Sequence, residues 1–218
     1  MPHRLLPLLL ALPLAAHALC TSDDVQPPAA LLERFVSADC ADCWRDPATP
    51  EPAAGTFAVD WIVPGQRGED APLAAVALDE ATERLEALKR AVPARSDAVF
   101  SRRAGTPVPL RLALGDAFND YIGTSVELKS REREEWHTWL LLVEQLPAGT
   151  EGSPVERHLV RNVFRPDWKP AGRPAGGLEE NRAMQIHAGV RPERLRLVAV
   201  LADSRGHIRA IRRTACSE

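Results

Sequence analysis

Two cysteines separated by two residues, Cys40 and Cys43, directly follow the first apolar run after the N-terminal leader, residues 29–36. This spacing at the end of a strand is typical of a thiol–disulfide redox pair. In an exported protein it suits a fixed structural disulfide or half of a metal site equally well. The cysteine pair therefore predicts a strand that ends beside it. Its role stays open between a redox pair, a structural disulfide and half of a metal site.

The first 18 residues have the pattern of a secretory signal peptide. Arg4 gives a weakly basic start, residues 5–16 are almost wholly apolar, and Ala16-His17-Ala18 supplies a small-x-small cleavage site. We therefore expect cleavage after about Ala18 and a periplasmic or secreted protein. Lipid attachment at Cys20 is a poorer match, because Leu19 stands where a small residue is needed.

Length and charge narrow the class of protein further. The 218 residues are 45% hydrophobic, which is enough for one substantial domain. No segment has the length and apolar content of a stable membrane span. The formal net charge is -3 and the sequence has no strongly basic stretch, so nucleic acid is not an expected partner.

The four cysteines allow three pairings. Cys40 with Cys43 is the local choice, which leaves Cys20 for Cys216. Such a bridge would tie the start of the mature chain to its last strand, since chain ends often lie close together. We expect this structural disulfide, with two free thiols as the alternative.

Hydrophobic periodicity predicts one long helix and a series of strands. Apolar residues recur every three or four positions over 73–92, which indicates a helix. Asp203-Ser204-Arg205-Gly206 has the chemistry of a hairpin turn. The predicted strands cover 31–36, 56–63, 108–114, 122–129, 135–145, 157–164, 195–202 and 207–213.

This order predicts an α+β fold, with a mixed α/β first part and a largely antiparallel β second part. We divide the chain into the signal peptide, 1–18, a first part, 19–115, and an antiparallel β-rich part, 116–218.

The segment LLERFVSADCADCW, residues 31–44, resembles the start of a bacterial family of secreted thioredoxin-like proteins of unknown function. Asp60-Trp61 is similar to an aspartate-aromatic pair in the next strand of that family. Residues 157–161 resemble a His-x-x-Val-Arg segment, and 197–211 resemble its closing hairpin. The residues that match the family's first segment are Glu33, Phe35, Ser37, Cys40 and Cys43.

The resemblance implies a thioredoxin-like α/β fold for the first part of the chain. It also implies that Cys40 is the exposed nucleophile, that Cys43 is the resolving thiol, and that a cis-proline lies beside them. Thr106-Pro107 is the first candidate for that proline, and Val108-Pro109 is the second.

The residues around the pair depart from the family's pattern. Pro47, Pro50 and Pro52 break the segment where the family has a long helix. Asp39 and Asp42 oppose ionisation of Cys40, whereas Arg34 and Arg45 favour it. The local charges therefore predict a sluggish thiol.

Two functions follow as hypotheses. The first is a weak or specialised thiol–disulfide role through Cys40, Cys43 and Pro107, with another exported protein as the partner. The second is a non-catalytic periplasmic binding or interaction protein with structural disulfides. A metal site would need further soft ligands, and the histidines are widely scattered, so we predict no metal and no cofactor.

Overall fold

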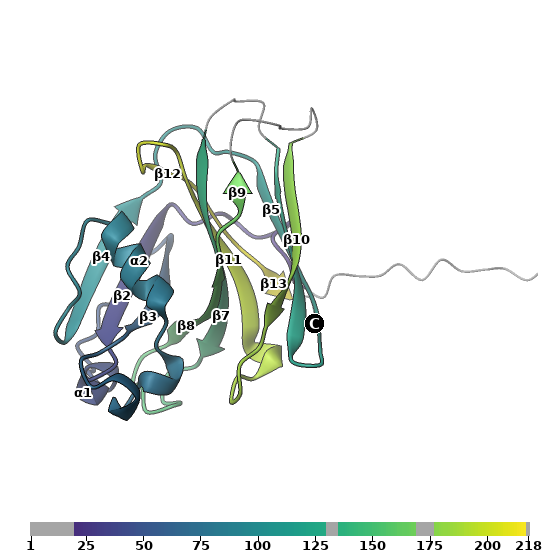
Figure 1. The fold of residues 1–218 in the computed structure, drawn as a ribbon. Coiled ribbons are helices and arrows are strands. Elements are labelled where there is room, and N and C mark those ends of the chain that lie inside the picture. The colour runs from purple at the N-terminus through teal and green to yellow at the C-terminus, as the bar shows by residue number, and fades with distance from the viewer. Residues whose placement is uncertain (1–19, 130–134, 169–176, 217–218) are drawn as a thin grey trace, which may run out of the picture.

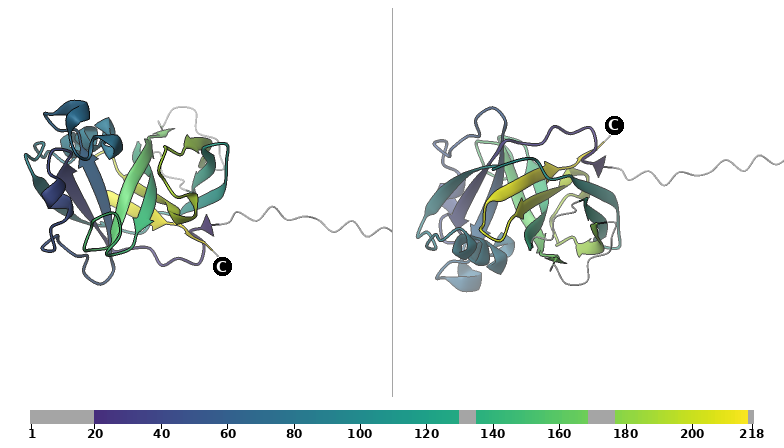
Figure 2. Two further views of the ribbon diagram at one scale, coloured as in Figure 1. Left: turned by 90° about the horizontal axis from the view of Figure 1, so that it is seen from below. Right: turned by 90° about the horizontal axis from the view of Figure 1, so that it is seen from above.

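The computed structural model describes residues 20–129, 135–168 and 177–216, and the predicted signal peptide lies outside them. Strands make up 47% of the described residues and helices 12%, so this part of the protein is mainly β. The strands form two sheets, and Figures 1 and 2 show them as two layers, with α2 lying against the larger sheet on the side away from the smaller one.

The smaller sheet is antiparallel throughout. Its order is β10-β6-β5-β1-β13. Its strands are β10 (Leu178–Gln185), β6 (Tyr121–Leu128), β5 (Leu110–Phe118), β1 (Cys20–Thr21) and β13 (Ala215–Cys216).

The larger sheet is mixed. Its order is β12-β11-β7-β8-β3-β2-β4, with β9 (Asp167–Trp168) added to β7, and β3 runs parallel to both of its neighbours. The main strands are β12 (Ile208–Arg213), β11 (Leu195–Ala202), β7 (Trp136–Leu146), β8 (Arg157–Phe164), β3 (Thr56–Val63), β2 (Ala30–Ser37) and β4 (Ser96–Arg102).

The main core fills the space between the two sheets. Alternate residues of β5 and β6 point from the smaller sheet toward alternate residues of β7 and β11, because side chains alternate between the faces of a strand. The contributing side chains include Leu112, Leu114, Val126, Leu140, Leu142, Leu197 and Leu201, each at most 1% exposed.

Helix α2 (Asp79–Ala87) covers the opposite face of the larger sheet. Its apolar residues Ala81 and Leu85 pack with Phe35 of β2 and Trp61 of β3. The same face carries an ion pair in the interior, in which Arg84 of α2 binds Glu33 of β2. The helix is therefore fixed by apolar packing and by a buried charge pair.

The predicted thioredoxin-like α/β fold is wrong, because the molecule is mainly a β-sandwich. Helix α1 (Ala41–Trp44), which begins after Cys40, has only four residues. The segment that follows it contains Pro47, Pro50 and Pro52. Strands β7 and β11 are buried on both faces and extend the sheet that begins with β2 and β3. The larger sheet therefore has a second apolar face, which the smaller sheet covers. In a thioredoxin-like domain, helices would have to cover that face.

The predicted helix over 73–92 is much shorter in the structure. Residues Ala74–Val76 form a 3₁₀ turn, η2, and α2 begins only at Asp79. Lys89 has φ = 56° just after the helix, a left-handed conformation that ends it. Two further 3₁₀ turns are η1 (Gly68–Asp70) and η3 (Pro192–Arg194).

Both sheets contain strands from the two predicted parts of the sequence. The division expected at residue 115 falls inside β5, and β8 of the second part pairs with β3 of the first.

Candidate functional site

Cys40 and Cys43 form a disulfide at the C-terminal end of β2. Cys40 is the N-cap of α1, and the backbone N–H of Cys43 donates to its Sγ at 3.3 Å. The pair thus lies where the sequence predicts it, but on a single helical turn, which offers little stabilisation of a thiolate.

Both cysteines are buried. Cys40 is 7% exposed and Cys43 is 6% exposed. They belong to a small apolar cluster that also contains Trp44, Leu146 and Leu159. Thiol–disulfide exchange needs an approaching thiolate to reach a sulfur atom, and this packing opposes such an approach.

A buried charge network fixes the segment that contains the cysteines. Asp60 of β3 accepts hydrogen bonds from Arg34 at 2.7 Å and from Arg157 at 2.9 Å. Its carboxylate also accepts the backbone N–H of His158 at 2.9 Å. All three charged side chains are at most 3% exposed, so the network belongs to the interior.

Arg157 connects this network to the cysteine segment. Its guanidinium donates to the carbonyl oxygen of Trp44 at 2.9 Å and to Thr49 Oγ1 at 3.0 Å, and it lies 4.6 Å from the centre of the Trp44 ring. Arg34 donates to the carbonyl oxygen of Pro50 at 3.1 Å. Burial lowers the pKa of Arg157, while Asp60 raises it. A charged residue inside a strongly apolar strand, such as Asp60, is the sequence signal for this network.

Of the four charged neighbours predicted to act on Cys40, Arg34 and Asp39 are engaged elsewhere, and Arg45 is exposed. Arg34 pairs with Asp60. Asp39 accepts the backbone N–H groups of Gln66 and Arg67 at 2.7 and 3.3 Å. Asp42 is exposed. None of these four side chains has a described hydrogen bond to either sulfur atom.

A cavity of about 400 Å³ lies beside the disulfide. Cys43 lines it together with Arg34 and Arg157 of the charge network. Asp46, from the segment after α1, and Asp97 of β4 line it as well. Its charges are therefore mixed, with cations and carboxylates on different walls.

Pro107 does not lie beside the cysteines. The described residues contain no cis peptide bond, so the prediction of a cis-proline at 107, with 109 as the second candidate, is wrong. Pro107 follows β4, whose last residue Arg102 pairs with Ala30 at the start of β2, whereas Cys40 follows the end of β2. At about 3.3 Å per residue, the two ends of β2 are roughly 23 Å apart.

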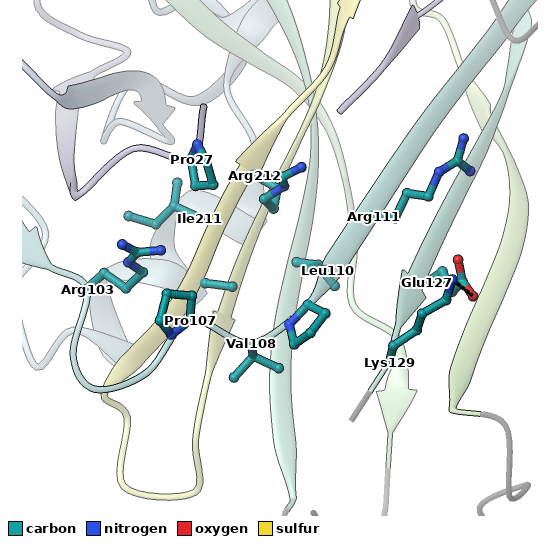
Figure 3. A pocket seen from close by; sticks show the side chains of 12 residues that line it. Pro27, Arg103, Pro107, Val108, Leu110, Arg111, Glu127, Lys129, Ile211 and Arg212 are labelled. Atoms are coloured by element: carbon teal, nitrogen blue, oxygen red, sulfur yellow. Dashed lines mark ion pairs between the residues drawn. The ribbon is translucent and has the colours of Figure 1, made fainter. Parts of the chain in front are cut away.

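Pro107 instead lines a separate pocket of about 310 Å³, shown in Figure 3. We call this the Pro107 pocket. Its walls come from the lead-in to β2, the connection between β4 and β5, the end of β6, and β12. The lining residues are Pro27, Arg103, Pro107, Val108, Pro109, Leu110, Arg111, Glu127, Lys129, Ala210, Ile211 and Arg212.

The second disulfide, Cys20–Cys216, is confirmed. It joins β1 to β13, where the two cysteines are paired in register. The segment after Cys20 contacts the Pro107 pocket: Asp23 binds Arg111 at 2.7 and 2.8 Å, and Arg212 donates to the carbonyl oxygen of Val25 at 3.3 Å. The hydrogen bonds from Arg111 lower the pKa of Asp23.

The two disulfides indicate an oxidising environment outside the cytoplasm. Within the described ranges, no helix has the length and apolar character needed to cross a membrane. The same residues contain no group of three or more histidine, cysteine, aspartate or glutamate side chains arranged to hold a metal ion.

No protein-family model, no curated protein and no solved structure matches this chain.

Proposed function

We propose that this chain is an exported, non-catalytic binding protein in which both disulfides are structural. The observation that carries the proposal is the burial of Cys40 and Cys43, each at most 7% exposed, among Trp44, Leu146 and Leu159. The predicted leader at 1–18 and the two disulfides together support a location in the periplasm or outside the cell.

The surroundings of the disulfide support a structural role. Arg157 donates hydrogen bonds to the Trp44 carbonyl oxygen and to Thr49, so the end of α1 and the segment after it are fixed from the interior. Pro107, the third residue expected at a redox site, lies away from the cysteines and lines the Pro107 pocket. The Pro107 pocket, with its apolar and cationic lining, supports the binding role.

A thiol–disulfide role is the second candidate function. It is favoured by one observation, namely that Cys43 lines the cavity of about 400 Å³ together with Arg34 and Arg157. Two cations near a sulfur would favour its thiolate form. The partner would then be another exported protein whose cysteine reaches Cys43 through this cavity.

A redox titration separates the two functions. The protein is equilibrated with a dithiothreitol series, the free thiols are alkylated, and each cysteine pair is read separately by peptide mass spectrometry. A structural Cys40–Cys43 bridge is expected to have a potential below about -300 mV. Reduction of this pair at a potential above about -270 mV, in the range of the oxidoreductases, would overturn the structural role.

A further inference from the structure

The Pro107 pocket carries more positive than negative charge. Four cations line it, Arg103, Arg111, Lys129 and Arg212, against one carboxylate, Glu127. Arg111 is paired with Asp23, and Lys129 lies 3.3 Å from Glu127. Among the described residues, this leaves Arg103 and Arg212 without a carboxylate partner.

Arg103 is the cation most available to a ligand. Its side chain is half-buried, and within the described part of the chain its guanidinium makes no hydrogen bond, ion pair or ring contact. Arg103 lies at one end of the pocket, and Arg111, Glu127 and Lys129 lie at the other (Figure 3).

Arg212 also lacks a full set of partners. It donates to the carbonyl oxygens of Ser22 and Val25, but its Nε–H is buried and has no partner. Burial lowers the pKa of Arg212, with a smaller opposing effect of Asp23. An anion in the pocket would therefore stabilise a positive charge that the protein itself leaves without an ion pair.

The space between the two charged ends is lined by apolar residues. Pro107, Val108 and Leu110 lie along it, and Pro27 and Ile211 close one side (Figure 3). The proline rings fix φ at their own positions, which lowers the conformational entropy that this wall loses when a ligand binds. The volume of about 310 Å³ is at the lower end of the range for small-molecule pockets, about 300–1,000 Å³.

We propose that the Pro107 pocket binds a small amphipathic carboxylate, whose carboxylate pairs with Arg103 and whose apolar body lies against Pro107, Val108 and Leu110. The inference gives a ligand class to the proposed binding role and rests on it. An arginine fork matches a carboxylate in two parallel hydrogen bonds, and the apolar wall gives the body of the ligand a surface to bury.

Isothermal titration calorimetry with three probes tests the ligand class. Octanoate has both the charge and the apolar chain, octanol lacks the charge, and acetate lacks the chain. We expect octanoate to bind at least about tenfold more tightly than either of the others, because each lacks one of the two contacts. Equal binding of octanol and octanoate, or of acetate and octanoate, would overturn the proposal.

Two neighbouring arginines provide a matched pair of variants. Arg103→Gln removes the free cation and is expected to weaken octanoate binding about tenfold. Arg102→Gln is the control, because Arg102 is exposed, packs on Phe100 and does not line the pocket. Unchanged octanoate affinity in Arg103→Gln, or an equal loss in Arg102→Gln, would contradict the assignment.

Failure of this inference is distinguishable from failure of the proposed function. If no probe binds while Cys40–Cys43 remains oxidised in the dithiothreitol titration, the ligand class is wrong and the structural disulfide stands. If Cys40–Cys43 is reduced above about -270 mV, the proposed function fails whatever the pocket binds.

Discussion

Arg84 of α2 binds Glu33 of β2 in a two-pronged ion pair, with Nε to Oε1 at 2.8 Å and Nη2 to Oε2 at 2.7 Å. Both side chains are almost fully buried, at 6% and 1% exposed. Arg84 also lies over the Trp139 ring, 5.3 Å from its centre. The pair therefore joins α2, the one helix of more than a single turn in the described residues, to β2, the strand beside the edge strand β4.

Replacing one member of this pair should be costly. Arg84→Met leaves the Glu33 carboxylate buried and unpaired, and we expect it to lower the free energy of unfolding by about 3–5 kcal/mol. Urea denaturation followed by tryptophan fluorescence measures the change. Arg90→Met is the control, because Arg90 forms a similar pair with Asp97 but is 49% exposed, and surface pairs contribute about 0–1 kcal/mol. Similar losses in both variants would show that burial does not control the effect.

Asp60 compensates two buried arginines at once, so its charge should matter more than its shape. Asp60→Asn keeps the volume but leaves Arg34 and Arg157 without a carboxylate, and we expect a loss of about 3–5 kcal/mol. Because Arg157 holds Trp44 and Thr49, the same variant should expose the proline-rich segment to limited proteolysis. Asp46→Asn, at an exposed aspartate of that segment, is the control. An Asp60→Asn protein with parental stability and protease resistance would contradict the role of the network.

The strands that the sequence predicts best are those with dense apolar and β-branched residues. The predicted ranges 56–63, 157–164 and 195–202 agree with β3, β8 and β11 at both ends. Strand β4 escaped prediction because four of its residues are exposed and its composition is mostly polar. Its hydrogen bonds to β2, rather than its side chains, make it a strand.

The fold class depended on information that local patterns do not contain. The order strand, cysteine pair, strand, helix is present, but the pairing of β3 with β8 joins residues about a hundred positions apart. The burial of β7 and β11 on both faces is consistent with several sheet arrangements. Which strands become neighbours is therefore decided by long-range packing.

The same dependence on long-range packing explains why only part of the candidate site was predicted from the sequence. The Cys20–Cys216 bridge follows from local pairing of the other two cysteines and from the tendency of chain ends to meet. The position of Pro107 depended on an assumed thioredoxin-like topology and failed with it. The Asp60 network was not predicted, since no sequence pattern pairs it with Arg34 and Arg157.

The Cys20–Cys216 disulfide should stabilise the protein and the Pro107 pocket together. It closes a loop of 196 residues, and its removal in a Cys20→Ser/Cys216→Ser variant should lower stability by roughly 2–5 kcal/mol. The segment that it anchors supplies Asp23 to Arg111 and the Val25 carbonyl to Arg212, so octanoate binding should weaken as well. Thermal unfolding and calorimetry measure the two effects.

Dithiothreitol provides the internal control for this variant. Under reducing conditions the parent should lose the same stability and the variant should lose much less, because it has no Cys20–Cys216 bridge to break. Equal melting temperatures of variant and parent under oxidising conditions would rule out a stabilising bridge.

His158 should make stability depend on pH. It is 8% exposed, its Nδ1 is buried without a partner, and Phe57 packs 4.5 Å from its ring. Burial lowers its pKa in the folded protein, outweighing the opposite effects of Glu156 and Asp60, whereas the unfolded chain keeps a value near 6.5. As the pH falls below about 6.5, the unfolded state takes up a proton before the folded state does, so the free energy of unfolding decreases until the folded pKa is reached.

The contribution of this one histidine can be isolated by comparing variants at pH 7 and pH 5. Other acidic groups also titrate toward the lower value, so the measured quantity is the loss of stability in the parent minus that in His158→Gln, from urea denaturation at each pH. We expect a positive difference, because the variant has no proton to bind at this position. His137→Gln, at an exposed histidine of β7, should keep the parental dependence. Parallel losses in the parent and in His158→Gln would show that burial of the His158 ring does not oppose its protonation.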